Sequence, residues 1–282
     1  MHFVKMQGAG NDFVLIDARA LERNWGKLAR AMCHRYFGVG ADGILLLLPS
    51  KVADFRMRLF NSDGSEAELS GNGLRCFARY VVENGMARGP EVRIETMAGV
   101  RVVQVHSRGG RISKIRVGMG VPRFAPAEIP VLIDAPVGRD GVSRVIDHPI
   151  EVGGRELKLT CLSMGNPHAV AFLDEPVGEF PLEEIGPRVE HHHLFPSRVN
   201  FEIVNIGGDR VVARVWERGA GETLACGSGI CAVAVAARLH GWIGDKVDII
   251  QPGGTLTVEW DGHGEVFLRG PAETVFRGEW LG

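Results

Sequence analysis

Two stretches of the chain decide how it folds: MRLFNSDGSEAELSGNGLRCFARYVVENG at residues 57–85 and ARVWERGAGETLACGSGICAVAVAARLHG at residues 213–241. Both contain a strand-like run, a glycine-rich turn and a helix-like run, in the same order. The positions that match are Arg58 and Arg214, Glu66 and Glu222, Gly71 and Gly227, Gly73 and Gly229, and Gly85 and Gly241. A repeat of this length indicates a duplicated structural unit. We therefore expect two similar halves.

Each half is expected to be rich in strands and to enclose one buried helix. Alternating or β-branched residues predict strands, among them 13–17, 55–60, 92–95, 100–106, 112–117, 211–216, 255–260 and 265–268. Helices are predicted only near residues 25–35, 72–84 and 227–240. The third of these contains ICAVAVAARL, which is apolar on nearly every side, so this helix must be buried. The expected fold class is α+β, a mixed α/β fold of two pseudo-symmetric domains.

Glycine and proline gather between residues 118 and 130, which is where we place the boundary. The predicted domains are residues 1–119 and 120–271, with the tail 272–282 added to the first half. A strand-like segment at 273–280 suits that tail, because an extended segment can pair with the first domain.

Composition excludes several classes of function. The formal net charge of the 282-residue chain is -2, so no basic excess favours nucleic acid as a partner. The longest aliphatic run, Ile44–Leu48, is far shorter than the ~20 residues that cross a bilayer. The start of the chain lacks the pattern of a signal peptide. We expect no membrane association and a cytoplasmic location.

Five cysteines occur in the chain, and their setting singles out one of them. The number is odd and no C-x-x-C pair occurs, which argues against a disulfide framework or a structural zinc site. Cys226 directly precedes a predicted helix, a position that lowers the pKa of a thiol and favours the thiolate. Cys226 is therefore the candidate reactive thiol.

The two glycine-rich turns predict a pair of anion sites. Ser70-Gly71-Asn72-Gly73 and Cys226-Gly227-Ser228-Gly229 each lead into a helix, whose N-terminus carries about half a positive charge. Glycine lets the backbone N–H groups come close to a carboxylate or phosphate. A carboxylate held in this way has a more acidic α-carbon, since the N–H groups stabilise the developing enediolate. One side chain then removes the α-proton, and the other returns a proton to the opposite face.

Five motifs support a resemblance to one family: Gly8-Ala9-Gly10-Asn11-Asp12-Phe13, Asn61-Ser62-Asp63-Gly64-Ser65-Glu66, Gly71-Asn72-Gly73-Leu74-Arg75-Cys76, Gly165-Asn166-Pro167-His168, and the segment from Glu217 to Gly229. Over essentially its whole length the chain resembles the diaminopimelate epimerases. These enzymes interconvert LL- and meso-diaminopimelate without pyridoxal phosphate, for lysine and peptidoglycan precursor synthesis. The resemblance implies two β-barrel-like domains, each around a central helix, with the site between them.

The resemblance also implies roles for individual residues. Cys226 would be one member of the acid/base pair. The reacting carboxylate would be held by Gly71, Asn72, Gly227 and Ser228, and the rest of the substrate by Asn11, Asn61, Asn166, Asn200, Glu217 and Arg218. These residue types suit an amino acid, because arginine pairs a carboxylate bidentately and glutamate pairs an ammonium group. Diaminopimelate is the expected small-molecule partner, no cofactor is expected, and a homodimer is a further expectation.

Ser70 departs from the family pattern, which usually has cysteine before the first Gly-Asn-Gly. Cys76 lies within the helix and does not replace it. A hydroxyl is a much poorer base than a thiolate, and loss of one acid/base group typically removes about 10² to 10⁴ in rate. Three explanations stay open. Ser70 and Cys226 could form a working pair, since related cofactor-free racemases with mixed pairs exist, or the serine could have been introduced to trap a complex. In the third, the protein has moved to another amino acid, as a related cofactor-free racemase, or has lost catalysis and still binds diaminopimelate.

Other motifs give no site. His191-His192-His193 cannot converge on one metal ion, and no carboxylate or cysteine is spaced to help, so no metal is expected. Gly8-Ala9-Gly10 lacks the third glycine and the following helix of a dinucleotide fingerprint. His168 is expected to orient a loop.

Overall fold

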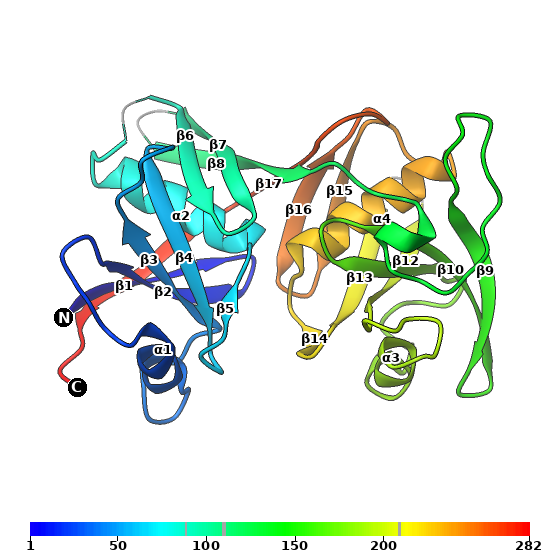
Figure 1. The fold of residues 1–282 in the computed structure, drawn as a ribbon, viewed down its shortest axis with the longest axis horizontal. Helices are drawn as coiled ribbons and strands as arrows, with labels where there is room; N and C mark the ends of the chain where they lie inside the picture. The colour runs from blue at the N-terminus through cyan, green and yellow to red at the C-terminus, as the bar shows by residue number, and fades with distance from the viewer. Residues whose placement is uncertain (88, 109–110, 208–209) are drawn as a thin grey trace. The chain divides into compact units, whose positions relative to one another are not determined.

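The computed structural model describes residues 1–87, 89–108, 111–207 and 210–282 of the chain. They form two compact units, drawn in Figure 1. Unit 1 contains Met1–Gly118 together with Arg269–Gly282, and unit 2 contains Met119–Leu268.

Unit 1 is a strand-rich domain with two helices. Its strands are β1 (His2–Gly8), β2 (Asn11–Asp17), β3 (Gly43–Leu48), β4 (Phe55–Asn61), β5 (Glu66–Ala67), β6 (Glu91–Thr96), β7 (Gly99–Arg108), most of β8 (Arg111–Gly120) and β18 (Glu273–Glu279), and its helices are α1 (Trp25–Cys33) and α2 (Gly71–Glu83). The tail strand β18 pairs antiparallel with β1.

Unit 2 repeats the plan. Its strands are β9 (Val145–Val152), β10 (Arg155–Ser163), β11 (Pro167–Phe172), β12 (Asn200–Gly207), β13 (Arg210–Glu217), β14 (Gly221–Thr223), β15 (Lys246–Gln251), β16 (Gly254–Glu259) and the start of β17 (Val266–Gly270), and its helices are the 3₁₀ turn η1 (Pro126–Glu128), α3 (Leu182–Glu190) and α4 (Gly227–Leu239).

The order of strand pairing confirms the predicted pseudo-symmetry. In unit 1, β1–β2 is antiparallel, β2–β3 parallel, β3–β4 and β4–β5 antiparallel, β4–β6 parallel and β6–β7 antiparallel. In unit 2 the same series runs from β10 to β16 with the same directions. An ion pair repeats as well, because Arg58 binds Glu66 across β4 and β5 while Arg214 binds Glu222 across β13 and β14. The predicted α+β fold class is confirmed.

Each unit encloses one central helix, as the apolar patterns predict. In α2, Leu74, Cys76, Phe77 and Val81 are fully buried, and in α4 every residue from Ile230 to Ala237 is buried. Burial of each large apolar side chain stabilises the folded state by about 1.5–3 kcal/mol. Together these side chains hold the helix inside its sheet. The N-termini of α2 and α4 are thereby fixed, and both carry predicted site residues.

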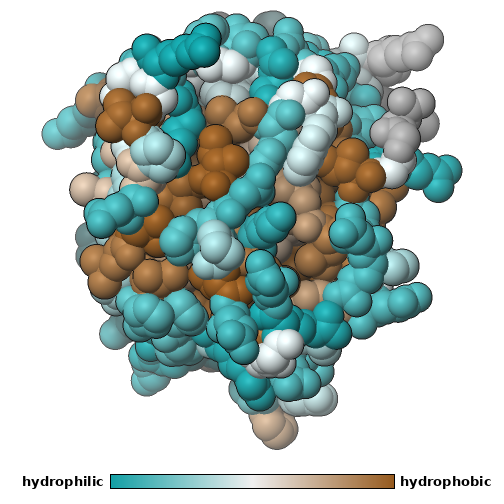
Figure 2. Space-filling view, turned by 90° about the vertical axis from the view of Figure 1, so that its right-hand side faces the viewer, coloured by the Kyte–Doolittle hydropathy of each residue, from teal (hydrophilic) through white to brown (hydrophobic). Residues whose placement is uncertain are grey.

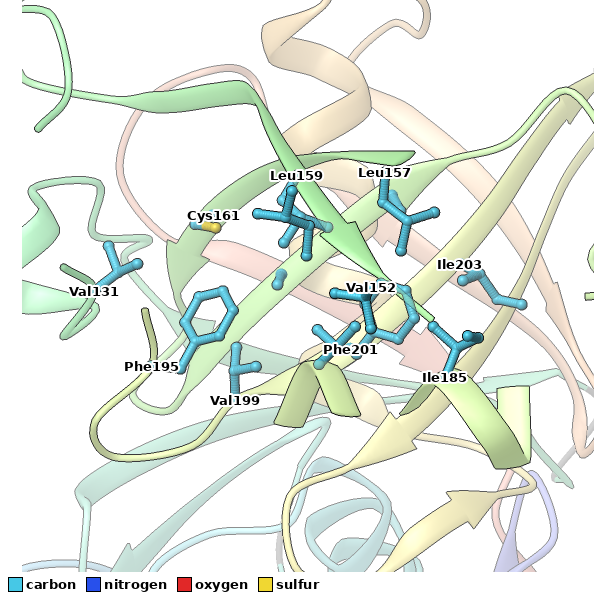
Figure 3. Close-up of a cluster of buried hydrophobic side chains, with 14 of the residues drawn as sticks. Val131, Val152, Leu157, Leu159, Cys161, Ile185, Phe195, Val199, Phe201 and Ile203 are labelled. Carbon is cyan, nitrogen blue, oxygen red and sulfur yellow. The ribbon is translucent and has the colours of Figure 1, made fainter. Parts of the chain in front are cut away.

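Helix α3 was not predicted from the sequence. It contains Gly186 and Pro187, both poor helix formers, so its local propensity is low. Packing forms it instead, since Leu182, Ile185 and Val189 are buried in the apolar core of unit 2. Figure 3 shows Ile185 beside Val152 and Phe201 in this core.

Apolar side chains also reach the surface of unit 2. Figure 2 shows brown apolar residues among teal hydrophilic ones on one face. The exposed apolar side chains of unit 2 include Leu132 and Val137. Apolar atoms make up more than half of the surface of ordinary folded proteins, so this exposure alone assigns no function. In the described part of the chain, no helix has both the length and the apolar character needed to cross a membrane.

Candidate active site

Ser70 caps the N-terminus of α2. Its backbone is extended, with φ -143° and ψ 120°, and its Oγ accepts a hydrogen bond from the backbone N–H of Gly73 at 3.0 Å. Serine is among the best N-cap residues because its oxygen satisfies one of the first-turn N–H groups. A Cβ on Gly73 would lie 3.2 Å from both Leu45 and Ser70, so a larger residue would crowd this turn.

Cys226 occupies the matching position on α4. Its backbone is also extended, and its Sγ accepts a hydrogen bond from the backbone N–H of Gly229 at 3.4 Å. The Ser228 Oγ lies 3.5 Å from the same sulfur. A Cβ on Gly229 would lie only 2.8 Å from Glu202 Oε1. Ser70 and Cys226 are therefore equivalent N-caps of two equivalent helices.

The turns that follow these caps are suited to a carboxylate. Gly71 and Asn72 are buried at the start of α2, and Gly227 is buried at the start of α4. The first N–H groups of a helix have no acceptor within the helix, and the macrodipole adds positive potential there. No acidic residue lies in the first turn of either helix, so the helix itself places no carboxylate against these N–H groups.

The predicted low pKa of Cys226 is wrong for this structure. The pKa of the thiol is raised well above its ordinary value, because burial penalises the charged form and Glu217 and Glu202 add negative potential. The hydrogen bonds from Ser228 and Gly229 lower the pKa of the thiol, but their effects are smaller. Position at a helix N-terminus lowers a thiol pKa only where desolvation is weaker than the field of the helix. Cys226 is thus a neutral thiol in the ligand-free protein.

Asn11 and Asn72 are brought together in unit 1. The Asn72 Nδ2 donates to Asn11 Oδ1 at 3.1 Å, and the Asn11 Nδ2 donates to Asp42 Oδ2 at 2.6 Å. The fully buried Arg75 donates to Asn72 Oδ1 at 2.6 Å and to the carbonyl of Pro271 at 3.0 Å. Both amides are therefore held in fixed orientations next to the start of α2.

Asn61 makes its side-chain hydrogen bond within its own turn. Its side chain is exposed at the end of β4, and its Nδ2 donates to Ser65 Oγ at 3.0 Å. Asn61 belongs to the turn between β4 and β5, which corresponds in the repeat to the turn after Trp216.

Asn166 lies beside the Cys226 turn in unit 2. Its Nδ2 donates to Ser228 Oγ at 3.4 Å, and its Oδ1 lies 2.9 Å from His168 Nε2. His168 Nδ1 in turn lies 2.7 Å from Glu202 Oε1. His168 is fully buried, which agrees with the predicted orienting role, because the ring fixes the Asn166 amide.

The remaining predicted residues lie at or beside the turn between β13 and β14: Glu217 ends β13, Arg218 follows it, and Asn200 begins the neighbouring strand β12. Asn200 Oδ1 accepts the backbone N–H of Arg218 at 2.9 Å, and Asn200 Nδ2 donates to the carbonyl of Pro167 at 2.8 Å. The Arg218 guanidinium donates to the carbonyl of Ser197 at 3.1 Å, and the hydroxyl of Thr223 donates to Glu217 Oε1. Asn200 thus links the turn that carries Arg218 to the segment that carries Asn166.

Sequence reasoning missed two buried carboxylates in unit 2, Glu202 and Glu190. Glu202 lies inside the apolar strand β12, where a single charge in an apolar run was the available signal. Burial raises its pKa, while His168 acts in the opposite direction. Glu190 ends α3 and contacts the turn of Arg218. Neither belongs to a motif quoted from the sequence.

The cysteines and histidines give no further centre in the described structure. All five cysteines are buried thiols outside any disulfide. Residues 1–87, 89–108, 111–207 and 210–282 contain no group of three or more His, Cys, Asp or Glu side chains placed to hold a metal ion.

Solved structures with this fold define its class. A phenazine biosynthesis protein of the PhzF family from Bacillus anthracis matches with a TM-score of 0.67 at 17% identity, over 100% of this chain and 99% of that chain. A hydroxyproline epimerase from Agrobacterium vitis matches with a TM-score of 0.69 at 19% identity, over 99% and 90%. The fold is therefore that of the PhzF-like and racemase-like proteins.

Sequence comparison narrows this class to one family. The family model described as diaminopimelate epimerase matches residues 3–125 and 160–275. A diaminopimelate epimerase of Moorella thermoacetica is 50% identical over 285 residues, 99% of each chain. One from Acetivibrio thermocellus is 45% identical over 282 residues, covering 99% of this chain and 98% of the relative. The chain belongs to the diaminopimelate epimerase family.

Proposed function

We propose that this protein is an isomerase that converts LL-diaminopimelate to meso-diaminopimelate, for lysine and peptidoglycan precursor synthesis. The observation that carries the proposal is the pair of equivalent N-caps, Ser70 on α2 and Cys226 on α4, each followed by a buried glycine turn. The whole-length identity of 50% to a diaminopimelate epimerase supports the choice of substrate.

The reaction inverts one α-carbon by moving one proton off and another on. N–H groups of Gly71 and Asn72 on α2, and of Gly227 and Ser228 on α4, hold the reacting carboxylate. Their positive potential stabilises the enediolate that forms when the C–H electron pair stays on the substrate. Either Cys226 or Ser70 takes the α-proton, and the other group gives its own proton to the opposite face. The reaction needs no pyridoxal phosphate.

Cys226 must ionise before it acts as the base. Its thiol is neutral in the ligand-free protein because burial raises its pKa. The α-ammonium group of a bound amino acid brings a positive charge close to the reacting carbon, and a nearby opposite charge favours the ionised form of a thiol. Substrate binding therefore activates the base in this proposal.

Ser70 is the slower partner of the pair. Its hydroxyl donates a proton readily enough to a carbanion, but it forms an alkoxide base only with difficulty. The Gly73 N–H that already points at Ser70 Oγ stabilises negative charge on that oxygen. We therefore propose a working Ser70/Cys226 pair with a reduced rate. The relatives give no support for an impaired binding protein over an active epimerase.

The distal end of the substrate is bound by polar groups that match a second amino-acid centre. Arg218 pairs its carboxylate and Glu217 pairs its ammonium group, while amide groups supply neutral hydrogen bonds. Those amides belong to Asn11, Asn61, Asn166 and Asn200. All four side chains already make hydrogen bonds within their own unit, which lowers the cost of ordering them on binding.

Chromatographic separation of the LL and meso isomers tests the proposal. The protein is incubated with LL-diaminopimelate without added pyridoxal phosphate, alongside Cys226→Ala and the matched variant Cys231→Ala, whose thiol is buried in the same helix. We expect meso isomer from the native chain, a loss of at least about 10²-fold in Cys226→Ala, and little change in Cys231→Ala. Absence of meso isomer with the native chain would refute the proposed function.

The cytoplasmic location, the homodimer and the absence of a nucleic-acid partner stay predictions. A net charge of -2 supports the last of these. Light scattering coupled to size-exclusion chromatography measures the mass in solution against the 30.6 kDa of one chain.

A further inference from the structure

Glu190 is a buried carboxylate in an unfavourable place. It is the last residue of α3 and only 3% of it is exposed. The C-terminal end of a helix carries partial negative charge, so the helix itself destabilises a carboxylate there. Burial adds a further cost, which hydrogen-bond donors must offset.

The donors come from the turn that carries Arg218. The indole N–H of Trp216 donates to Glu190 Oε2 at 2.8 Å, and the backbone N–H of Gly219 donates to Oε1 at 2.9 Å. The guanidinium of Arg198 lies 3.6 Å from Oε1. The Glu190 carboxylate therefore accepts hydrogen bonds from both ends of residues 216–219. Glu217 and Arg218 lie between these two contacts.

Helix α3 is shaped to bring this carboxylate to the turn. A Cβ on Gly186 would lie 2.6 Å from the Trp216 ring, so only glycine lets the indole pack this closely against the helix. The ring then directs its N–H to the end of the same helix. Glycine at position 186 thus lowers the helix propensity of α3, but it allows the packing against Trp216 that brings Glu190 to the turn.

In unit 1 the equivalent turn is contacted by a hydrogen-bond donor of the helix instead of an acceptor. There the guanidinium of Arg30, on α1, donates to the carbonyl of Asp63 at 2.9 Å. A Cβ on Gly26 of α1 would lie 2.7 Å from the carbonyl of Gly64, which shows the same close approach of helix and turn. In both units a short helix contacts the turn. In unit 2 a carboxylate of that helix accepts a backbone N–H of the turn, whereas in unit 1 a guanidinium of that helix donates to a backbone carbonyl of the turn.

We propose that Glu190 is a positioning residue that sets where Arg218 and Glu217 meet the substrate. This inference rests on the proposed function, which makes those two residues the ligands of the distal amino-acid centre. Glu190 itself touches no substrate. Glu190 orders the turn before substrate binds. Its loss therefore weakens binding of the substrate and of the transition state by the same factor.

Steady-state kinetics of Glu190→Gln test this role. The amide keeps the shape but has one oxygen, so a donor now faces either the Gly219 N–H or the Trp216 indole N–H. We expect KM for LL-diaminopimelate to rise about tenfold while kcat stays within about twofold, the signature of lost uniform binding. The control is Glu184→Gln, an exposed carboxylate of the same helix that pairs with Arg188, and it should change neither constant.

Trp216→Phe provides the second variant, because it keeps an aromatic ring and removes the indole donor together with part of the ring volume. Its KM is expected to rise in the same direction by a smaller factor. If kcat falls in Glu190→Gln while KM is unchanged, or if both variants match the native protein, the inference is overturned.

Amide hydrogen exchange separates this inference from the proposed function, since it needs no substrate. In Glu190→Gln the amide of Gly219 should exchange at least about tenfold faster than in the native protein and in Glu184→Gln. Unchanged protection at Gly219 overturns the inference even if the enzyme is active. Lack of turnover by the native chain overturns the proposed function, while faster exchange at Gly219 still supports the anchoring of the turn by Glu190.

Discussion

Replacing Ser70 with cysteine should speed the epimerase reaction. If the hydroxyl limits proton transfer, a thiol at the same position recovers about 10²- to 10⁴-fold in kcat, which corresponds to a barrier lower by about 2.7–5.4 kcal/mol. The structure indicates that a thiol fits, because Cys226 occupies the equivalent N-cap and accepts from Gly229 N–H at 3.4 Å, against 3.0 Å for Ser70 and Gly73.

The same substitution should cost a little stability. Sulfur is a weaker acceptor than a hydroxyl oxygen, so the cap of α2 loses at most about 1 kcal/mol. For a chain of this size that is a fall of about 2–4 °C in Tm. A faster but slightly less stable enzyme is the expected combination.

Initial rates of meso-diaminopimelate formation provide the assay for Ser70→Cys. Ser70→Ala, which removes both proton and cap, should fall below the native rate. Ser113→Cys, an exposed serine of β8, controls for an added thiol elsewhere. The reasoning is refuted if Ser70→Cys is no faster than the native chain, or if Ser70→Ala retains the native rate.

Three further predictions follow from single contacts. Gly229→Ala places a Cβ 2.8 Å from a carboxylate oxygen of the buried glutamate on β12, so activity and Tm should both drop, whereas Gly178→Ala, with nothing within 4 Å, should be neutral in both. The pKa of Glu66 is lowered chiefly by its hydrogen bond to Arg58, so its contribution to stability is present above the ordinary glutamate pKa and is lost as pH falls below it. The urea midpoint of the native chain should therefore exceed that of Glu66→Gln at about pH 7, and the gap should narrow as pH falls below the ordinary glutamate pKa; a gap that widens in acid would contradict this. Because burial raises the pKa of Cys226, its alkylation in the ligand-free protein should be slow at neutral pH and still rising above pH 9.0, and a plateau near neutrality would show a stable thiolate instead.

The repeat made most of the fold predictable. Glycines and charged residues matched in order along both halves, and the apolar run of α4 required a buried helix. The observed helix, Gly227–Leu239, ends one residue before the predicted one. Local patterns succeeded here because a helix apolar on all sides has only one stable environment.

Features that depend on packing were not predictable. Helix α3 contains Gly186 and Pro187, and only the core of unit 2 and the ring of Trp216 explain why it forms. The pKa of Cys226 was predicted in the wrong direction, because burial and two neighbouring carboxylates are properties of the folded chain. Glu190 escaped notice for the same reason, since its partners lie on another element.

Deuterium incorporation from D₂O tests the central claim most directly, that Cys226 and Ser70 together invert the α-carbon. The native chain is incubated with LL-diaminopimelate in D₂O, and early samples of substrate and product are analysed by proton NMR. The thiol and the hydroxyl can each hold only one exchangeable proton, and the base holds none before it acts. The account therefore predicts meso product with deuterium at the inverted carbon and recovered LL substrate that still carries protium. Deuterium entering the LL substrate without inversion, or no incorporation in either isomer, would contradict it.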